Sequence, residues 1–168
     1  NQNNKMTKHK TGVYFHDVPT DPFSGICTTD HKDAEKLGYF KLDILNVNIY
    51  KEVNSPAHLD ALLSREPLWE LLQEKEFCEL VFHLGSHHWI CQAMKPDNIE
   101  KLAAVLAMIR PAKCHLVGER WEVVMREVWK PVEDGTYAFK RSHAYSYAMA
   151  VMVHMNLLCE QLSGNSTH

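Results

Sequence analysis

The chain has 168 residues, 45% of them hydrophobic and 23% charged, which is ordinary globular usage and excludes collagen-like and wholly disordered classes. Lysine and arginine number 18 against 21 aspartates and glutamates, giving a formal net charge of −3. This balance argues against a protein that holds nucleic acid by overall charge. Any contact with nucleic acid must therefore be local.

The cysteines and the apolar stretches indicate the cellular compartment and whether the chain spans a membrane. The five cysteines are odd in number, and segment 1–10 has no apolar core that could act as a secretory signal. We therefore expect reduced thiols and a cytoplasmic protein. The longest apolar stretch, 144–158, is interrupted by Ser146, His154 and Asn156 and is shorter than a bilayer-spanning helix. No membrane association is predicted.

The N-terminal third predicts two short strands and one short helix. Segment 12–15 is rich in β-forming residues, and the polar segment 30–36 suits a single short helix. Segment 39–45 alternates, which predicts a strand with one apolar face. The other face of this strand presents Lys41 and Asp43, an ammonium and a carboxylate two residues apart.

Helical patterns dominate from residue 55 onward. Ser55 is a typical N-cap, and Pro56 suits the first helical position. The run D-N-I-E at 97–100 is a variant of the capping box, and Pro111 stops the helix that it begins. We expect Ser142 to cap the last helix. One helix is predicted to begin at residue 55. Four further helices are predicted over 66–76, 97–109, 119–129 and 142–162.

No repeat or linker divides the chain, so we expect one domain over 9–162 between flexible tails at 1–8 and 163–168. The predicted fold class is α+β and mostly helical. A small β-sheet around the strand at 39–45 is expected to pack on the helices.

The densest cluster of metal-ligand types is formed by His83, His87, His88 and Cys91. If Ser86 begins a helix, His87 and Cys91 share a face at a separation of four residues. However, the chain has no C-x-x-C or H-E-x-x-H pair. Ordinary surface and core histidines are therefore the favoured interpretation over a zinc site.

A basic run, Lys140-Arg141-Ser142-His143, precedes the last predicted helix. Helix N–H groups, the helix dipole and two cations would converge there, as in an anion site. An exposed basic cap without a ligand fits the run equally well, so both interpretations stay open. Among only seven glycines there is no G-x-S-x-G, Walker or G-x-G-x-x-G motif, so serine hydrolases and classical nucleotide folds have no support.

Three stretches, in this order, resemble the C-family replicative DNA polymerases, the α subunit of bacterial DNA polymerase III. The first is TTDHKDAEKLGYFKLDIL at 28–45, similar to the palm segment that ends in K-x-D-x-L. The second is the segment 78–111, similar to a V-F-Q-L-E-S segment followed by a K/Q-P-D helix. The third is YAFKRSHAYSYAMAVM at 137–152, similar to Y-G-F-N-K-S-H-A-A-Y-A of the fingers.

The resemblance implies roles for particular residues. Lys41 and Asp43 fall on the lysine and on the third catalytic aspartate of the family, so Asp43 would be a metal ligand. The resemblance places five further residues near the nucleotide and the template, where they would bind DNA or nucleotide weakly. These residues are Ser86, Arg110, Lys140, Arg141 and His143.

The chain departs from the family in the residues that bind the metals and the triphosphate. Two further aspartates on an earlier palm strand have no counterpart, and neither has the arginine-rich motif that grips the triphosphate. Two-metal phosphoryl transfer requires carboxylates that hold two cations about 3.5–4 Å apart. We therefore expect the chain alone to lack polymerase activity, with Mg²⁺ bound at Asp43 only where a partner supplies further carboxylates.

Two functional hypotheses follow. In the first, the chain is a truncated palm and fingers fragment, phage-encoded, that acts in DNA replication in a bacterium or an infected host cell. It would be part of a split polymerase with a second polymerase chain, or an inactive derivative. In the second, it is a non-enzymatic interaction protein that binds or modulates a replication protein or another host protein. The sequence leaves both open.

Overall fold

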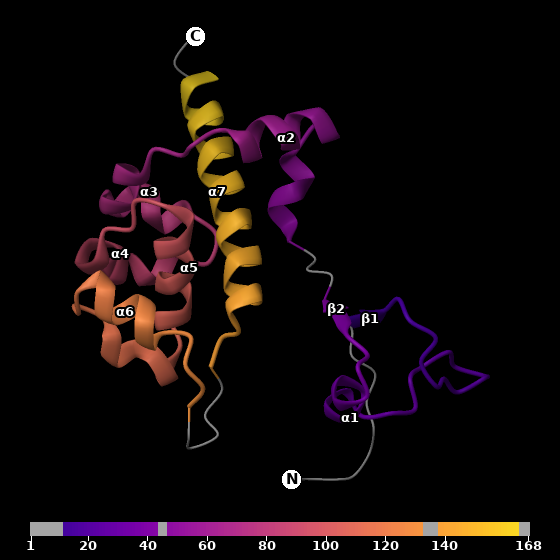
Figure 1. Ribbon diagram of the computed structural model, residues 1–168. Helices are drawn as coiled ribbons and strands as arrows, with labels where there is room; N and C mark the ends of the chain where they lie inside the picture. The colour runs from indigo at the N-terminus through magenta and orange to yellow at the C-terminus, as the bar shows by residue number, and fades with distance from the viewer. Residues whose placement is uncertain (1–11, 44–46, 133–137, 165–168) are drawn as a thin grey trace. The chain divides into compact units, whose positions relative to one another are not determined.

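The computed structural model describes residues 12–43, 47–132 and 138–164 (Figure 1). The chain divides into two compact units, residues 1–47 and residues 48–168, where the sequence predicted a single domain. No proline or glycine run marks this division, which is why the sequence predicted no boundary there. Each unit is described by itself.

The N-terminal unit contains the two predicted strands and the predicted short helix. Strand β1 (Gly12–Tyr14) pairs antiparallel with β2 (Lys41–Asp43), and Val13 lies opposite Leu42. Helix α1 (His31–Lys36) lies between them in the chain. Strand β2 is shorter than the predicted segment, whose last two residues lie outside the described residues.

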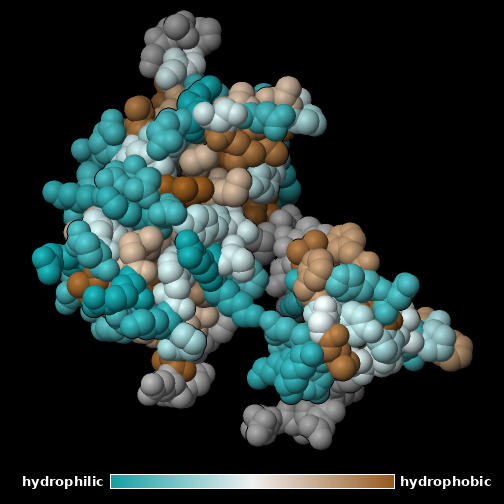
Figure 2. All heavy atoms as spheres, viewed as in Figure 1, coloured by the Kyte–Doolittle hydropathy of each residue, from teal (hydrophilic) through white to brown (hydrophobic). Residues whose placement is uncertain are grey.

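Most apolar side chains of the described N-terminal unit are exposed, as the brown spheres of this unit in Figure 2 illustrate. Phe15 is 68% exposed and Phe40 is 54% exposed. The strand register places both on the same face as Val13 and Leu42, because residues two apart in a strand point to one side. This β-ribbon face is apolar.

The C-terminal unit is helical; the predicted cap at Ser55 is confirmed, whereas the helix expected from the capping box at 97–100 is capped by Asn98 instead of Asp97. The Ser55 hydroxyl accepts the His58 N–H at 3.1 Å, and the Asn98 side chain accepts the Lys101 N–H at 2.9 Å. The elements are η1 (Asn48–Glu52), α2 (Pro56–Ser64), η2 (Trp69–Gln73), α3 (Lys75–Leu80), η3 (Gly85–His87), α4 (His88–Met94), α5 (Ile99–Met108), η4 (Pro111–Leu116), α6 (Trp121–Glu127) and α7 (Arg141–Gly164).

Three details of the predicted helices are wrong. The segment predicted as one helix over 66–76 is the 3₁₀ turn η2, then an extended Glu74, then the start of α3. Helix α7 begins at Arg141, so Ser142 lies inside its first turn instead of capping it. The helix also continues to Gly164, into the predicted tail.

The core forms where α5 packs along α7, and α2 lies against another face of α7 (Figure 1). Residues 102–108 of α5 are all buried. The buried Asn156 side chain of α7 donates to the carbonyls of Leu62 and Arg65, each at 2.9 Å, and so fixes the end of α2. The predicted fold class, α+β and mostly helical, is confirmed.

One buried lysine completes the packing of η4 against α6. The Lys113 ammonium is 5% exposed and donates to the carbonyls of Glu127 and Lys130, each at 2.8 Å. It therefore satisfies carbonyl groups at the C-terminal end of α6 that have no partner within the helix. Within the described ranges, no helix combines the length and apolarity that crossing a bilayer demands.

Candidate anion-binding site

A cavity of about 110 Å³ lies in the C-terminal unit beside Arg110, just after the end of α5. The turn before α4, the end of α5, the residues before α7 and the second turn of α7 all contribute to its wall. Its lining residues are His83, His87, Leu106, Ile109, Arg110, Phe139 and Tyr147.

Arg110 supplies the positive charge of the cavity. Its guanidinium carbon lies 5.0 Å from the centre of the Phe139 ring, a cation–π distance. Its Nε atom is buried and has no hydrogen-bond partner among the described residues. A buried donor without a partner is costly, and Arg110 is the one residue of the described cavity lining that carries a permanent charge.

His83 lies in the turn between α3 and α4 in a conformation that is uncommon for a residue with a side chain, with φ of 63°. Its ring meets the Tyr147 ring edge to face at 4.5 Å between centroids. Burial lowers the pKa of His83, and the nearby charges of Arg110 and His87 lower it further. His83 is therefore neutral at pH 7, with one ring N–H donor.

The turn that carries His83 is fixed from both sides. The Phe82 N–H donates to Nδ1 of His154 on α7 at 2.9 Å. A Cβ atom on Gly85 would lie 2.8 Å from the Glu79 carbonyl oxygen, so only glycine allows this close approach. The turn is thus held against α3 and α7.

The aromatic wall comes from the beginning of α7 and the residues before it. The Phe139 and Tyr147 rings lie 5.5 Å apart between centroids. The His143 ring, one turn before Tyr147, lies 6.3 Å from the Phe139 ring. Arg110 lies over the Phe139 ring of this wall, and the His83 ring lies against its Tyr147 ring.

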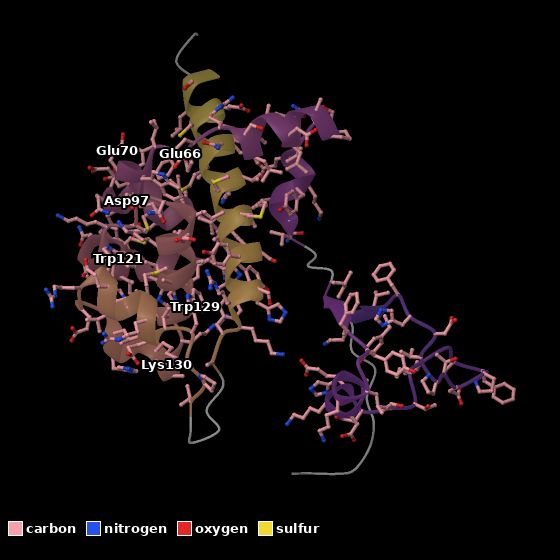
Figure 3. All side chains as sticks on the ribbon, in the orientation of Figure 1. Glu66, Glu70, Asp97, Trp121, Trp129 and Lys130 are labelled. Carbon is pink, nitrogen blue, oxygen red and sulfur yellow. The ribbon has the colours of Figure 1, made fainter. Side chains whose placement is uncertain are left out.

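The predicted basic residues divide between two places. Arg141 lies over the rings of Trp129 and Tyr145, at 6.0 and 5.5 Å, and Trp129 is labelled in Figure 3. Lys140 and Ser86 are exposed. Of the residues that the resemblance places near nucleotide, Arg110 alone lines the cavity in the described part of the chain. A joint anion site of Lys140, Arg141 and His143 with Arg110 stays a prediction.

The two residues expected to be catalytic lie in the other unit. Lys41 and Asp43 are the ends of β2, where their backbones pair with Tyr14 and Gly12. The side chain of Asp43 is outside the described residues. Catalysis and metal binding at this strand stay predictions.

The histidine and cysteine cluster is dispersed. His83 and His87 line the cavity, whereas Nε2 of His88 lies 3.2 Å from the Gln73 carbonyl. Cys91 is buried beside Cys78, and their hydrogen bond raises the pKa of Cys91. No group of three or more His, Cys, Asp or Glu side chains among the described residues is placed to hold a metal.

No family model, curated protein or solved structure matches the chain. The geometry of the cavity is therefore the basis for any proposal. Sequence reasoning identified Arg110 but missed the aromatic wall of Phe139 and Tyr147. The separation of four residues between His143 and Tyr147 was a signal that both lie on one helix face.

Proposed function

We propose that the chain is a DNA-binding component of a replication assembly with no polymerase activity of its own. One observation carries this proposal. The second and third stretches that resemble the polymerase family pack together as α5 on α7, and Arg110 of the second stacks on Phe139 of the third. A functional site shared by the two stretches requires this kind of contact.

The chemistry around the contact suits single-stranded DNA. Arg110 offers a guanidinium beside aromatic rings, and the exposed Lys140 and Arg141 lie at the beginning of α7. Proteins that bind single strands combine cations for the phosphates with aromatic or guanidinium surfaces for the bases. Because the whole chain is acidic, we expect weak binding confined to this end of the C-terminal unit.

The lack of polymerase activity follows from the carboxylates. Asp43 is the single residue that matches a catalytic aspartate of the family, and one carboxylate does not hold two cations. A partner chain with paired aspartates would complete the Mg²⁺ site with Asp43 and Lys41. The reduced cysteines expected from the sequence favour the cytoplasm for this assembly.

Fluorescence anisotropy of a labelled single-stranded oligonucleotide tests DNA binding. We expect K140A/R141A to weaken binding and to reduce the salt slope by about 0.7 for each phosphate that the variant no longer neutralises. The matched control is K51A/K75A, which removes two exposed lysines elsewhere in the C-terminal unit. Equal effects of the two double variants, or no binding at low salt, would contradict the proposal.

A primer-extension assay tests the absence of polymerase activity. The purified chain, given Mg²⁺ and dNTPs, is expected to extend no primer. Extension that the D43N variant abolishes would show that the chain polymerises alone and would refute this part of the proposal.

A second candidate function, a non-enzymatic interaction protein, is favoured by the apolar β-ribbon face of the N-terminal unit. Val13, Phe15, Phe40 and Leu42 expose apolar side chains on this face, as protein-binding surfaces do. A pull-down with the wild type and with L42K distinguishes the candidates. If the wild type captures an intact replisome component and L42K does not, the result favours the interaction protein. If the wild type captures a chain with paired aspartates, the result favours the split polymerase.

A further inference from the structure

We propose that the cavity at Arg110 binds a phosphate monoester, and that in the DNA-bound protein this is the terminal phosphate of a strand. This inference rests on the proposed function for the identity of the strand, but not for the phosphate chemistry. It is carried by the size of the cavity, by its donors and by its apolar wall.

The size of the cavity selects a small group. A volume of about 110 Å³ is somewhat less than the roughly 150 Å³ of an engineered protein cavity that accommodates benzene. A phosphate group fits this space, whereas a nucleoside does not. An internal phosphodiester continues into a sugar on both sides, so a cavity of this size admits the end of a strand more readily than its middle.

The donors select an oxyanion. Arg110 brings a planar guanidinium whose Nε is buried and without a partner among the described residues. The guanidinium fork matches the oxygens of phosphate in geometry as well as in charge. His83 and His87, from a different segment of the chain, also line the cavity and carry ring nitrogens that can bind an oxyanion.

The carboxylates of the described residues do not compete for this arginine. The guanidinium carbon lies 5.0 Å from the centre of the Phe139 ring. No aspartate or glutamate is among the residues that line the described cavity. A cation held by an aromatic ring instead of a carboxylate keeps its hydrogen-bonding capacity for a ligand. The aromatic wall lowers the local polarity beside the guanidinium, which strengthens its attraction for phosphate.

The experiment uses the full chain and two kinds of probe. Inorganic phosphate is titrated while the ring signals of the histidines are followed by NMR, with sulfate-free buffer throughout. In parallel, anisotropy compares one oligonucleotide sequence with a hydroxyl at both ends, with a 5′-phosphate and with a 3′-phosphate.

We expect inorganic phosphate to shift the His83 and His87 signals. A terminal phosphate at one end is expected to strengthen oligonucleotide binding by about tenfold, equivalent to about 1.4 kcal/mol. Arg110→Gln and His87→Gln should each abolish both effects. Because Arg110→Gln also removes the contact with Phe139, the His87 variant tests the cavity from a segment that does not depend on that contact. K51A/K75A is the matched control and should leave both effects unchanged.

The outcomes separate the two proposals. Equal affinity for all three oligonucleotides, together with unshifted histidine signals, overturns the phosphate site while DNA binding can still hold. Phosphate binding that Arg110→Gln and His87→Gln abolish, without any binding of oligonucleotides, supports the cavity and overturns the proposed DNA function. Phosphate effects that persist in both variants overturn this assignment of the site.

Discussion

Replacement of His154 by leucine tests how the turn beside the cavity is held. His154 lies on α7, and its Nδ1 accepts the Phe82 N–H at 2.9 Å. Because the backbone donates this bond, Nδ1 carries no proton and the ring is neutral. Leucine keeps the apolar bulk but has no acceptor, so the variant leaves the partly buried Phe82 N–H without its partner.

The expected cost is that of one unsatisfied donor, about 1–3 kcal/mol of unfolding free energy. At a denaturant dependence of about 2 kcal/mol per molar urea, this lowers the urea midpoint by about 0.5–1.5 M. His115→Leu makes the same substitution at an exposed position and is expected to change stability by at most about 0.5 kcal/mol.

The effect of His154→Leu depends on pH. Burial lowers the pKa of His154, and the nearby Glu52 charge opposes this only in part. Below the unfolded pKa of about 6.5 the unfolded chain binds a proton at this position that the folded chain does not, so the contribution of His154 falls as pH falls. Above that pKa the contribution is complete.

Urea unfolding of the wild type and His154→Leu, followed by tryptophan fluorescence, measures this dependence. The difference between the two proteins should be largest near pH 8 and should shrink below about pH 6.5. Other titrating groups, such as His83, are present in both proteins, so their contributions cancel in the difference. A difference that stays constant with pH, or grows towards acid, would refute the reasoning.

Two further substitutions are expected to destabilise the protein, a third serves as a near-neutral control, and one alkylation experiment tests the cysteines. Lys113→Met removes the ammonium that satisfies carbonyls at the end of α6, and urea unfolding should show a loss of about 2–3 kcal/mol. Gly85→Ala places a methyl group 2.8 Å from a backbone carbonyl of α3 and should cost about 1–3 kcal/mol in the same assay. Gly164→Ala, where nothing lies within 4 Å, should be near neutral. Iodoacetamide followed by mass spectrometry should find the exposed Cys114 alkylated in the native protein, but the buried Cys91 alkylated only after unfolding.

Features that depend on neighbouring residues were predictable from the sequence. The cap at Ser55, a helix start within 97–100 and the helix stop at Pro111 were predicted, because each signal acts within three or four residues of its own position. The pairing of β1 with β2 agrees with the predicted strands, because short alternating segments pair when a chain returns on itself.

The predicted helix over 66–76 failed because of packing. In one continuous helix, two residues five positions apart, such as Leu72 and Phe77, would point about 140° apart. Both are buried in the same core, so the chain instead straightens at Glu74 and begins α3 in a new orientation. Helical periodicity over 66–76 carries no information about this requirement.

The candidate site was the least predictable feature. Arg110 was identified, but the cavity joins it to His83, Phe139 and Tyr147, which lie about 30 residues away on either side in the sequence. Only the packing of α5 along α7 brings these segments together. Arg141 is not among the residues that line the cavity, and its guanidinium lies over the Trp129 and Tyr145 rings.

The position of α7 in the chain has a consequence for biosynthesis. This helix supplies the partner surface for α5 and α2, and its Asn156 reaches the Leu62 carbonyl 94 residues earlier in the chain. A ribosome makes the elements from α2 to α6 well before it makes α7. Until then the side of α5 that packs on α7 stays exposed, although η4 and α6 already pack on other sides of α5, and this nascent surface is open to aggregation or to chaperones. Folding of the C-terminal unit therefore waits until translation has passed most of α7, whatever the local helix propensities.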